Sequence, residues 1–124
     1  MPTLNIYVTL DVNANPQVIL KDSAGNSARN EKAASGNTIK WQKQDNNDTF
    51  DITSLAPTGP GEAFSAATTG GSGQWLQSEF YPLTGDPPDT PYSYTLTVTD
   101  EDGHPHDTTQ TENAPDDGRP VIRN

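Results

Sequence analysis

Apolar and polar residues alternate along several short stretches of the chain, most regularly near its start. In residues 4–12 every second side chain is apolar, and mostly polar side chains stand between them. The same alternation returns in residues 92–98, where serine and threonine separate the apolar and aromatic side chains. A period of two is typical of a β-strand with one buried face, so both segments are predicted to be strands. The side chains expected on their buried faces are Leu4, Ile6, Val8, Leu10, Val12, Tyr92, Tyr94, Leu96 and Val98.

Shorter versions of this pattern occur in five other segments, which are bounded by Gly, Pro, Asn and Asp. Such residues favour turns and interrupt regular structure. No segment has the apolar spacing of a helix that we would expect to be stable. The tetrad at residues 45–48 consists of Asp and Asn, so we expect it to close a hairpin between the strands on either side. The five segments are residues 17–22, 38–44, 49–55, 75–80 and 119–124.

Short strands separated by turn-rich loops, without helical connections, indicate an all-β fold. We expect a single antiparallel β-sandwich of about seven strands, formed by one domain that covers residues 1–124. Phe64 is expected to anchor the middle one of three long polar loops to the body. Loops on a rigid scaffold often carry function, so we expect contacts with ligands there. The loops cover residues 23–37, 57–73 and 99–118.

The chain is strongly acidic, with 17 acidic against seven basic residues and a net charge of −10. Such a surface repels the phosphate backbone of nucleic acids and anionic membranes. We therefore expect a protein partner, with self-association as one form of it, and neither nucleic acid nor a membrane. No apolar run approaches the roughly 20 residues that a transmembrane helix needs. The first residues show no signal-peptide pattern, which makes the cytoplasm the default expectation.

Cysteine is absent, which excludes disulfides, zinc–thiolate sites, iron–sulfur clusters and thiol nucleophiles. Both histidines lie in one short loop, and no serine stands in a strained elbow motif beside a base. No glycine-rich loop precedes a helix, so a nucleotide has no obvious binding platform. We expect no catalytic residues, no bound organic cofactor and no enzymatic activity.

Three segments resemble the cupredoxin-like and immunoglobulin-like β-sandwiches: LNIYVTLDV at the start, YSYTLTV as the penultimate strand, and PVIRN as the closing one. In copper cupredoxins, the loop after the penultimate strand carries a cysteine, a histidine and usually a methionine. Here that strand ends in Val98 and Thr99, the chain has no cysteine, and its one methionine is Met1. The resemblance therefore implies a copper-free sandwich without a blue-copper site.

One candidate site follows this strand, in the sequence DEDGHPHD at residues 100–107. Asp100 and Asp102 with the glycine between them and the histidines resemble part of a calcium loop, although the later acids of such a loop are missing. His104 and His106 are two residues apart, so in extended structure both would point to one side and could hold zinc, nickel or copper(II). The alternative is a hairpin turn that runs into an exposed loop.

The two tryptophans are the other candidates for binding, because aromatic faces can form a platform for sugars. Trp41 alternates with the apolar set of its segment and is expected to be buried. Trp75 follows the glycine-rich loop and is expected to be exposed. The expected function is a non-catalytic acidic binding or interaction module that could serve as an assembly subunit. The alternatives are a metal-binding module at residues 100–107 and a carbohydrate-binding module at Trp75.

Overall fold

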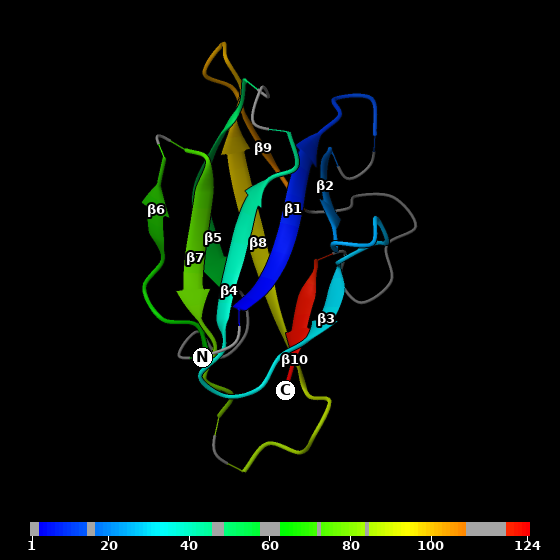
Figure 1. Cartoon of the computed structure of the whole chain (residues 1–124), viewed down its shortest axis with the longest axis vertical. Helices are drawn as coiled ribbons and strands as arrows, with labels where there is room; N and C mark the ends of the chain where they lie inside the picture. The colour runs from blue at the N-terminus through cyan, green and yellow to red at the C-terminus, as the bar shows by residue number, and fades with distance from the viewer. Residues whose placement is uncertain are drawn as a thin grey trace.

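The computed structural model describes residues 3–14, 17–45, 49–57, 63–71, 73–83, 85–108 and 119–124. In these residues the protein is all-β, with ten strands and no α-helix (Figure 1). The strands are β1 (Thr3–Leu10), β2 (Val18–Lys21), β3 (Asn30–Lys32), β4 (Thr38–Lys43), β5 (Asp51–Pro57), β6 (Thr68–Gly70), β7 (Trp75–Glu79), β8 (Pro91–Thr99), β9 (Pro105–Asp107) and β10 (Val121–Arg123).

The strands form two sheets that face each other across a shared core. The first sheet has the order β2-β1-β4-β7-β6. The second has the order β3-β10-β8-β5, and β9 also pairs with β8. In the view of Figure 1 the first sheet lies in front of β5 and β8, and each sheet has one face towards the other. This arrangement is compatible with a β-sandwich.

Both sheets are mixed, so the expectation of a purely antiparallel fold is wrong. In the first sheet β1 runs parallel to β4, and in the second β10 runs parallel to β3. All other pairs are antiparallel. The parallel pairs arise because the chain leaves the first sheet after β2, forms β3 in the second sheet, and then returns as β4. The alternation of side chains along a strand does not specify its neighbours.

The predicted hairpin around residues 45–48 is also wrong. Strand β4 pairs with β1 and β7, whereas β5 pairs with β8 in the other sheet. Residues 46–48 themselves lie outside the described part of the chain. The two strands that follow each other in sequence are therefore separated by the core rather than joined by hydrogen bonds.

Ten strands are described rather than about seven, because each of the three expected loops contains a short strand. Strands β3, β6 and β9 fall within residues 23–37, 57–73 and 99–118 and have three residues each. Most of their side chains are exposed, so their sequences show no apolar alternation. Residues 58–62, 72 and 109–118 of these loops lie outside the described residues.

The core consists mainly of the side chains that the alternation predicted. The inward residues of β1, β2, β4, β5 and β8 are buried or nearly so, which confirms the predicted faces of β1 and β8. Val12 is the exception: it follows the end of β1 in a turn and is 56% exposed. Phe64 is buried in the core, as expected for an anchor of its loop. The largest fully buried side chains are Trp41, Tyr92, Tyr94 and Phe80.

An unbroken chain of aromatic rings crosses this core from one sheet to the other. Trp41 of β4 contacts Tyr94 of β8 with ring centroids 5.2 Å apart, edge to face. Phe64 lies against Tyr94 and against Phe80, and Phe80 lies against Tyr92. Edge-to-face pairs of this kind add about 0.5–1.5 kcal/mol beyond the burial of their area. These contacts hold the two sheets at a fixed position relative to each other.

A hydrogen bond accompanies the first of these contacts. The Trp41 indole N–H donates to the Tyr94 hydroxyl at 3.2 Å, inside the core. Burial raises the pKa of Tyr94 far above its ordinary value, so the hydroxyl stays neutral. At the other end of the aromatic chain, the Tyr92 hydroxyl donates to the Asp86 carboxylate and accepts the Leu83 N–H, which pins the proline-rich segment before β8.

No helix of the described residues has the length and apolar character needed to cross a membrane.

Removing the Tyr94 hydroxyl is expected to destabilise the protein. The Tyr94→Phe variant leaves the Trp41 N–H buried without an acceptor, which costs about 1–3 kcal/mol. A loss of that size lowers the melting temperature by several degrees in a domain of this length. The matched control is Tyr7→Phe, because the Tyr7 hydroxyl makes no hydrogen bond among the described residues. Equal melting temperatures of the two variants in thermal unfolding would contradict this account of the core.

Candidate functional site

The sequence DEDGHPHD comprises the hairpin turn after β8 and the strand β9 that follows it, and Asp100 builds the turn. Its Oδ1 atom accepts the backbone N–H groups of Asp102 and His104, both at 2.9 Å. Backbone hydrogen bonds from Asp100 to His104 and from Gly103 to Asp100 close the turn. Gly103 has a φ of +86°, a backbone conformation that residues other than glycine rarely adopt. The turn geometry is thus fully explained by local hydrogen bonding.

The second carboxylate oxygen of Asp100 faces both histidines. His106 Nε2 lies 2.9 Å from Asp100 Oδ2, and His104 Nδ1 lies 3.8 Å from the same atom. The two rings differ in environment, because the His104 side chain is 74% exposed and that of His106 only 13%. His106 is drawn inward because it pairs with Val98, whose side chain points into the core.

His106 connects the second sheet to the segment before β2 through one ring nitrogen, and its other ring nitrogen contacts Asp100 of its own hairpin. Its Nδ1 atom lies 2.7 Å from Oε1 of Gln17, the residue directly before β2. Gln17 Nε2 donates to the carbonyl of Val12, which leaves Oε1 as the acceptor for the histidine. The ionised carboxylate of Asp100 also only accepts. Each ring nitrogen of His106 therefore lies within hydrogen-bond distance of an oxygen that accepts hydrogen bonds.

Three of the four predicted metal ligands come together at this turn. Asp100, Asp102 and His104 each offer one ligand atom, and these atoms lie within 4.8 Å of one another. One imidazole with two carboxylates suits zinc, nickel or copper(II) better than calcium, which takes six to eight oxygen ligands. His106 contacts the same carboxylate, but its nitrogens are already engaged by Asp100 and Gln17.

Hydrogen bonds to Asp100 favour its charged form. The bond with His106, followed by the backbone N–H groups of the turn, lowers the pKa of Asp100 below its ordinary value of 3.8. A carboxylate with a lowered folded pKa contributes stability above the pKa of the unfolded chain, and this contribution is lost as the pH falls through the folded value. The turn should therefore weaken only in acid.

The two tryptophans lie on opposite sides of the first sheet. Trp41 is fully buried, which confirms the expectation for it. Trp75, at the start of β7, belongs to the opposite face, since its neighbour Leu76 points into the core. Trp75 is half-buried rather than fully exposed, and the reason is its contact with β6. Gly70 of β6 pairs with Trp75, and the indole occupies the space where a side chain at position 70 would stand.

The contact with Gly70 fixes the indole ring against the sheet. A Cβ atom added to Gly70 would come within 2.1 Å of Trp75 Cζ2. The ring thus lies directly over the backbone of β6. The ammonium group of Lys40 lies over the ring as well, 5.1 Å from its centroid, in a cation–π contact. The sequence signal that could have located this ring is the glycine at position 70, but only the strand register shows that the two residues meet.

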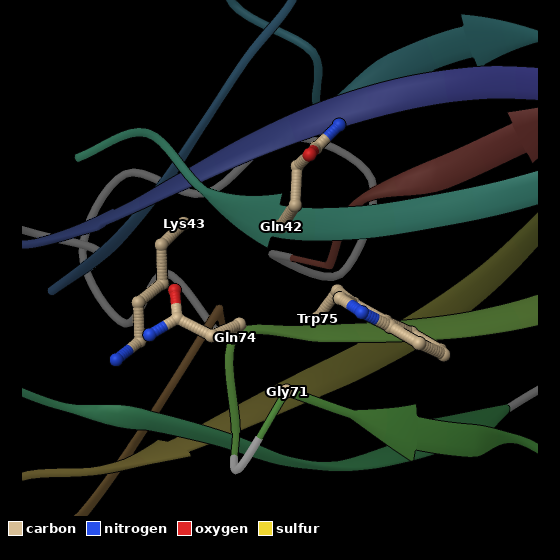
Figure 2. A pocket seen from close by; sticks show the side chains of 5 residues that line it. All are labelled: Gln42, Lys43, Gly71, Gln74 and Trp75. Atoms are coloured by element: carbon tan, nitrogen blue, oxygen red, sulfur yellow. The ribbon is translucent and has the colours of Figure 1, made fainter. Parts of the chain in front are cut away.

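An open hollow of about 420 Å³ lies beside Trp75, where β4 meets the turn between β6 and β7. Figure 2 shows Lys43 and Gln74 on one side of it, the Trp75 ring on the other, and Gln42 turned away. Gln42 donates to Asn5 Oδ1, whereas Gln74 Oε1 is buried and has no hydrogen-bond partner among the described residues. The residues that line the hollow are Gln42, Lys43, Gly71, Gln74 and Trp75.

A second hollow, of about 370 Å³, lies beside Tyr7 of β1. It is formed by Tyr7, by the turn after β2, and by Gln44, which directly follows β4. Tyr7 was not predicted to be a binding residue, because it falls on the polar side of its strand. The alternation itself could have found it: an aromatic ring at a position that must face away from the core is a candidate for binding.

No known family model matches the chain, and no curated protein matches it significantly. The expected resemblance to cupredoxin-like or immunoglobulin-like proteins therefore has no support from a relative. The two mixed sheets establish an all-β fold compatible with a sandwich.

Acid should remove the contribution of Asp100 to stability selectively. The Asp100→Asn variant keeps an oxygen for the turn but loses the charge that faces His106, so we expect a lower melting temperature than wild type at about pH 6. As the pH falls to about 2, Asp100 of the wild type becomes protonated and the difference should shrink towards zero. Asp102→Asn is the control, because this side chain accepts no hydrogen bond within the described turn. A difference that stays constant with pH would show that the charge of Asp100 is not involved.

Proposed function

We propose that the protein is a non-catalytic binding module and that its ligand binds the outer face of the first sheet, around Trp75. The observation that carries this proposal is the indole ring, held flat over Gly70 beside an open hollow. An aromatic ring fixed in this way offers a large contact area and loses little conformational freedom on binding. The size of the hollow is within the usual range of ligand sites.

Polar groups without partners support the same place. The Trp75 indole N–H and the side-chain amide of Gln74 make no hydrogen bond among the described residues. A ligand that supplies both donors and acceptors would satisfy them. Support for a non-catalytic role comes from His106, whose described partners are Gln17 and Asp100 rather than a serine or threonine hydroxyl.

Of the two sandwich types that the sequence resembles, we favour the cupredoxin-like one, without copper. Immunoglobulin-type sandwiches are built from antiparallel sheets, whereas each sheet here contains one parallel pair. A blue-copper centre requires a cysteine ligand, which the chain lacks. The type of sandwich concerns only the scaffold of the site, because fold alone does not determine function.

The role of the outer face can be tested by displacing the indole without removing it. In Gly70→Ala the added Cβ forces Trp75 away from β6, since the backbone at position 70 is not in the left-handed region. Both Gly70→Ala and Trp75→Ala should reduce binding at least about tenfold, which is about 1.4 kcal/mol. The measurement is binding of labelled protein to paired glycan and peptide arrays.

The matched control is Tyr81→Ala, which removes the other exposed aromatic side chain of the described residues. Its binding should equal that of wild type. Binding that survives in Trp75→Ala, or an absence of binding on both arrays, would refute the proposed face.

A metal site at the β8–β9 turn is the second candidate, favoured by the grouping of Asp100, Asp102 and His104. The two histidines differ in their surroundings, since the His104 side chain is exposed and that of His106 lies between Asp100 and Gln17. His104→Ala should abolish a thermal shift caused by zinc, nickel or copper(II) and leave the melting temperature without metal unchanged. His106→Ala should lower that melting temperature itself.

A metal at 100 times its dissociation constant stabilises the folded state by about 2.7 kcal/mol, which is several degrees in melting temperature. Calcium serves as the comparison ion, for which we expect no shift because the turn offers too few oxygen ligands. If no ion shifts the melting temperature of the wild type, the turn has a structural role only.

A further inference from the structure

Each hollow borders the outer face of the first sheet, one at Trp75 and one at Tyr7, and a single cross-strand row connects these two residues. Strand pairing places Lys21, Tyr7, Gln42, Trp75 and Gly70 opposite one another across all five strands of the first sheet. Neighbouring strands are about 4.7–4.9 Å apart, so the row extends over roughly 19 Å. In Figure 1 these strands lie side by side at the front, from β2 to β6. A ligand that reaches both hollows must be an extended chain that crosses the strands.

The aromatic residues of the row lie two strands apart. Tyr7 and Trp75 are separated by Gln42, which places their backbones about 9–10 Å from each other. The Trp75 ring leans over Gly70, and Tyr7 borders the hollow at the turn after β2, so the rings themselves are farther apart. This spacing fits several consecutive sugar rings of a linear glycan, with Gln42 and Gln44 between the two stacking positions.

Each aromatic residue has a lysine beside it that forms no ion pair. Lys40 lies over the Trp75 ring, and Lys21 is the cross-strand partner of Tyr7. Neither lysine has a carboxylate partner among the described residues. In a chain with 17 acidic and seven basic residues, two lysines on one face without a carboxylate partner among the described residues are unexpected. Their charge is available to a ligand.

Acidic side chains are nearly absent from the same face. Along the five strands, the only outward-facing acid is Glu79, four residues from Trp75 along β7, and it is hydrogen-bonded by Tyr81. Asp22 borders the Tyr7 hollow, but its Oδ1 already accepts the backbone N–H groups of Ala24 and Asn26. Lys21 and Lys40 thus stand against Glu79 and Asp22, which leaves this face close to neutral on a molecule whose net charge is −10.

We infer that this face binds a linear glycan that carries carboxylates, laid across the strands from the Trp75 hollow to the Tyr7 hollow. The inference rests on the proposed function and names the ligand class of that site. Sugar rings stack on Trp75 and Tyr7, hydroxyl groups bond to the side-chain amides of Gln42 and Gln44, and the carboxylates pair with Lys40 and Lys21. A phosphate polymer fits less well, because its denser charge is repelled by the acidic remainder of the surface.

A peptide ligand is less suited to this surface than a glycan. Peptides that bind sheets commonly add to an edge through backbone hydrogen bonds, whereas here the groups on offer are side chains in the middle of the sheet. The large exposed apolar side chains of the described residues are Val12 and Tyr81, and neither lies in the row. The hollows thus provide no apolar pocket for peptide side chains.

Binding should be measured by isothermal titration with two series of oligosaccharides, from disaccharide to hexasaccharide. One series is β-1,4-linked mannuronate and the other β-1,4-linked mannose, which differ only in the carboxylate; galacturonate and galactose oligomers form a second pair. We expect the uronate chains to bind with an affinity that rises with length, and to bind at least about tenfold more tightly than the neutral chains. Added salt should weaken this binding.

The variants divide the site into its parts. Trp75→Ala should reduce binding of the longest uronate at least about tenfold, and Lys40→Ala about twofold to fivefold, as for an exposed ion pair. Tyr7→Ala should remove the gain from chain length, so that long chains bind no better than short ones. Tyr81→Ala should bind like wild type, and the melting temperature of each variant shows that it is folded.

Four outcomes distinguish the glycan inference from the proposed binding face on which it rests. Uronate binding that depends on Trp75, Tyr7 and Lys40 supports the inference. Equal or tighter binding of the neutral chains overturns the role of the lysines. Peptide binding that depends on Trp75, with no glycan bound, overturns the glycan inference but keeps the proposed face. If no probe shows binding that depends on Trp75, both are overturned.

Discussion

The contact between Trp41 and Tyr94 is the interaction on which the arrangement of the two sheets depends. Trp41 belongs to β4, the central strand of the first sheet, and Tyr94 to β8, which pairs with three strands of the second. Their rings are in edge-to-face contact, and a buried hydrogen bond fixes their orientation. An unpaired indole N–H in this position would be costly, so each ring requires the other. The chain has a low apolar content, and a few large aromatic side chains supply much of its core.

The same contact determines which side chains remain on the outside. Because Trp41 must face the core, its neighbours Lys40 and Gln42 must face outward. Leu76 pairs with Trp41 and is buried, so Trp75 beside it also faces outward. The proposed binding face is thus a direct result of how the core is filled. Its groups are attached to strands rather than to loops, which limits the freedom that a ligand must remove on binding.

The sequence predicted those features that depend on alternation alone and missed those that depend on which strands are neighbours. The long strands β1 and β8 and the burial of Trp41 and Phe64 were correctly predicted, because side-chain alternation and aromatic character are visible along the chain. The parallel pairing of β1 with β4 was not predicted, because the order of strands in a sheet is not visible in the local sequence. Trp75 was identified as a candidate from the sequence. Its contact with Gly70 and its place in one row with Tyr7 were not predicted, because both depend on which strands are neighbours. His106 was a candidate metal ligand with an exposed loop as the alternative, whereas its pairing with Val98 turns it towards the core.

The position of β10 has a consequence for how the chain reaches its folded state. This strand comes last in the sequence, yet it lies between β3 and β8 and joins them into one sheet. Its partner Asn30 is 91 residues earlier than Val121, so the ends of a long loop must meet before this pairing forms. Contacts of such long range slow folding. During synthesis, the facing edges of β3 and β8 stay unpaired until residues 121–123 leave the ribosome, and in that interval the nascent chain is most exposed to aggregation.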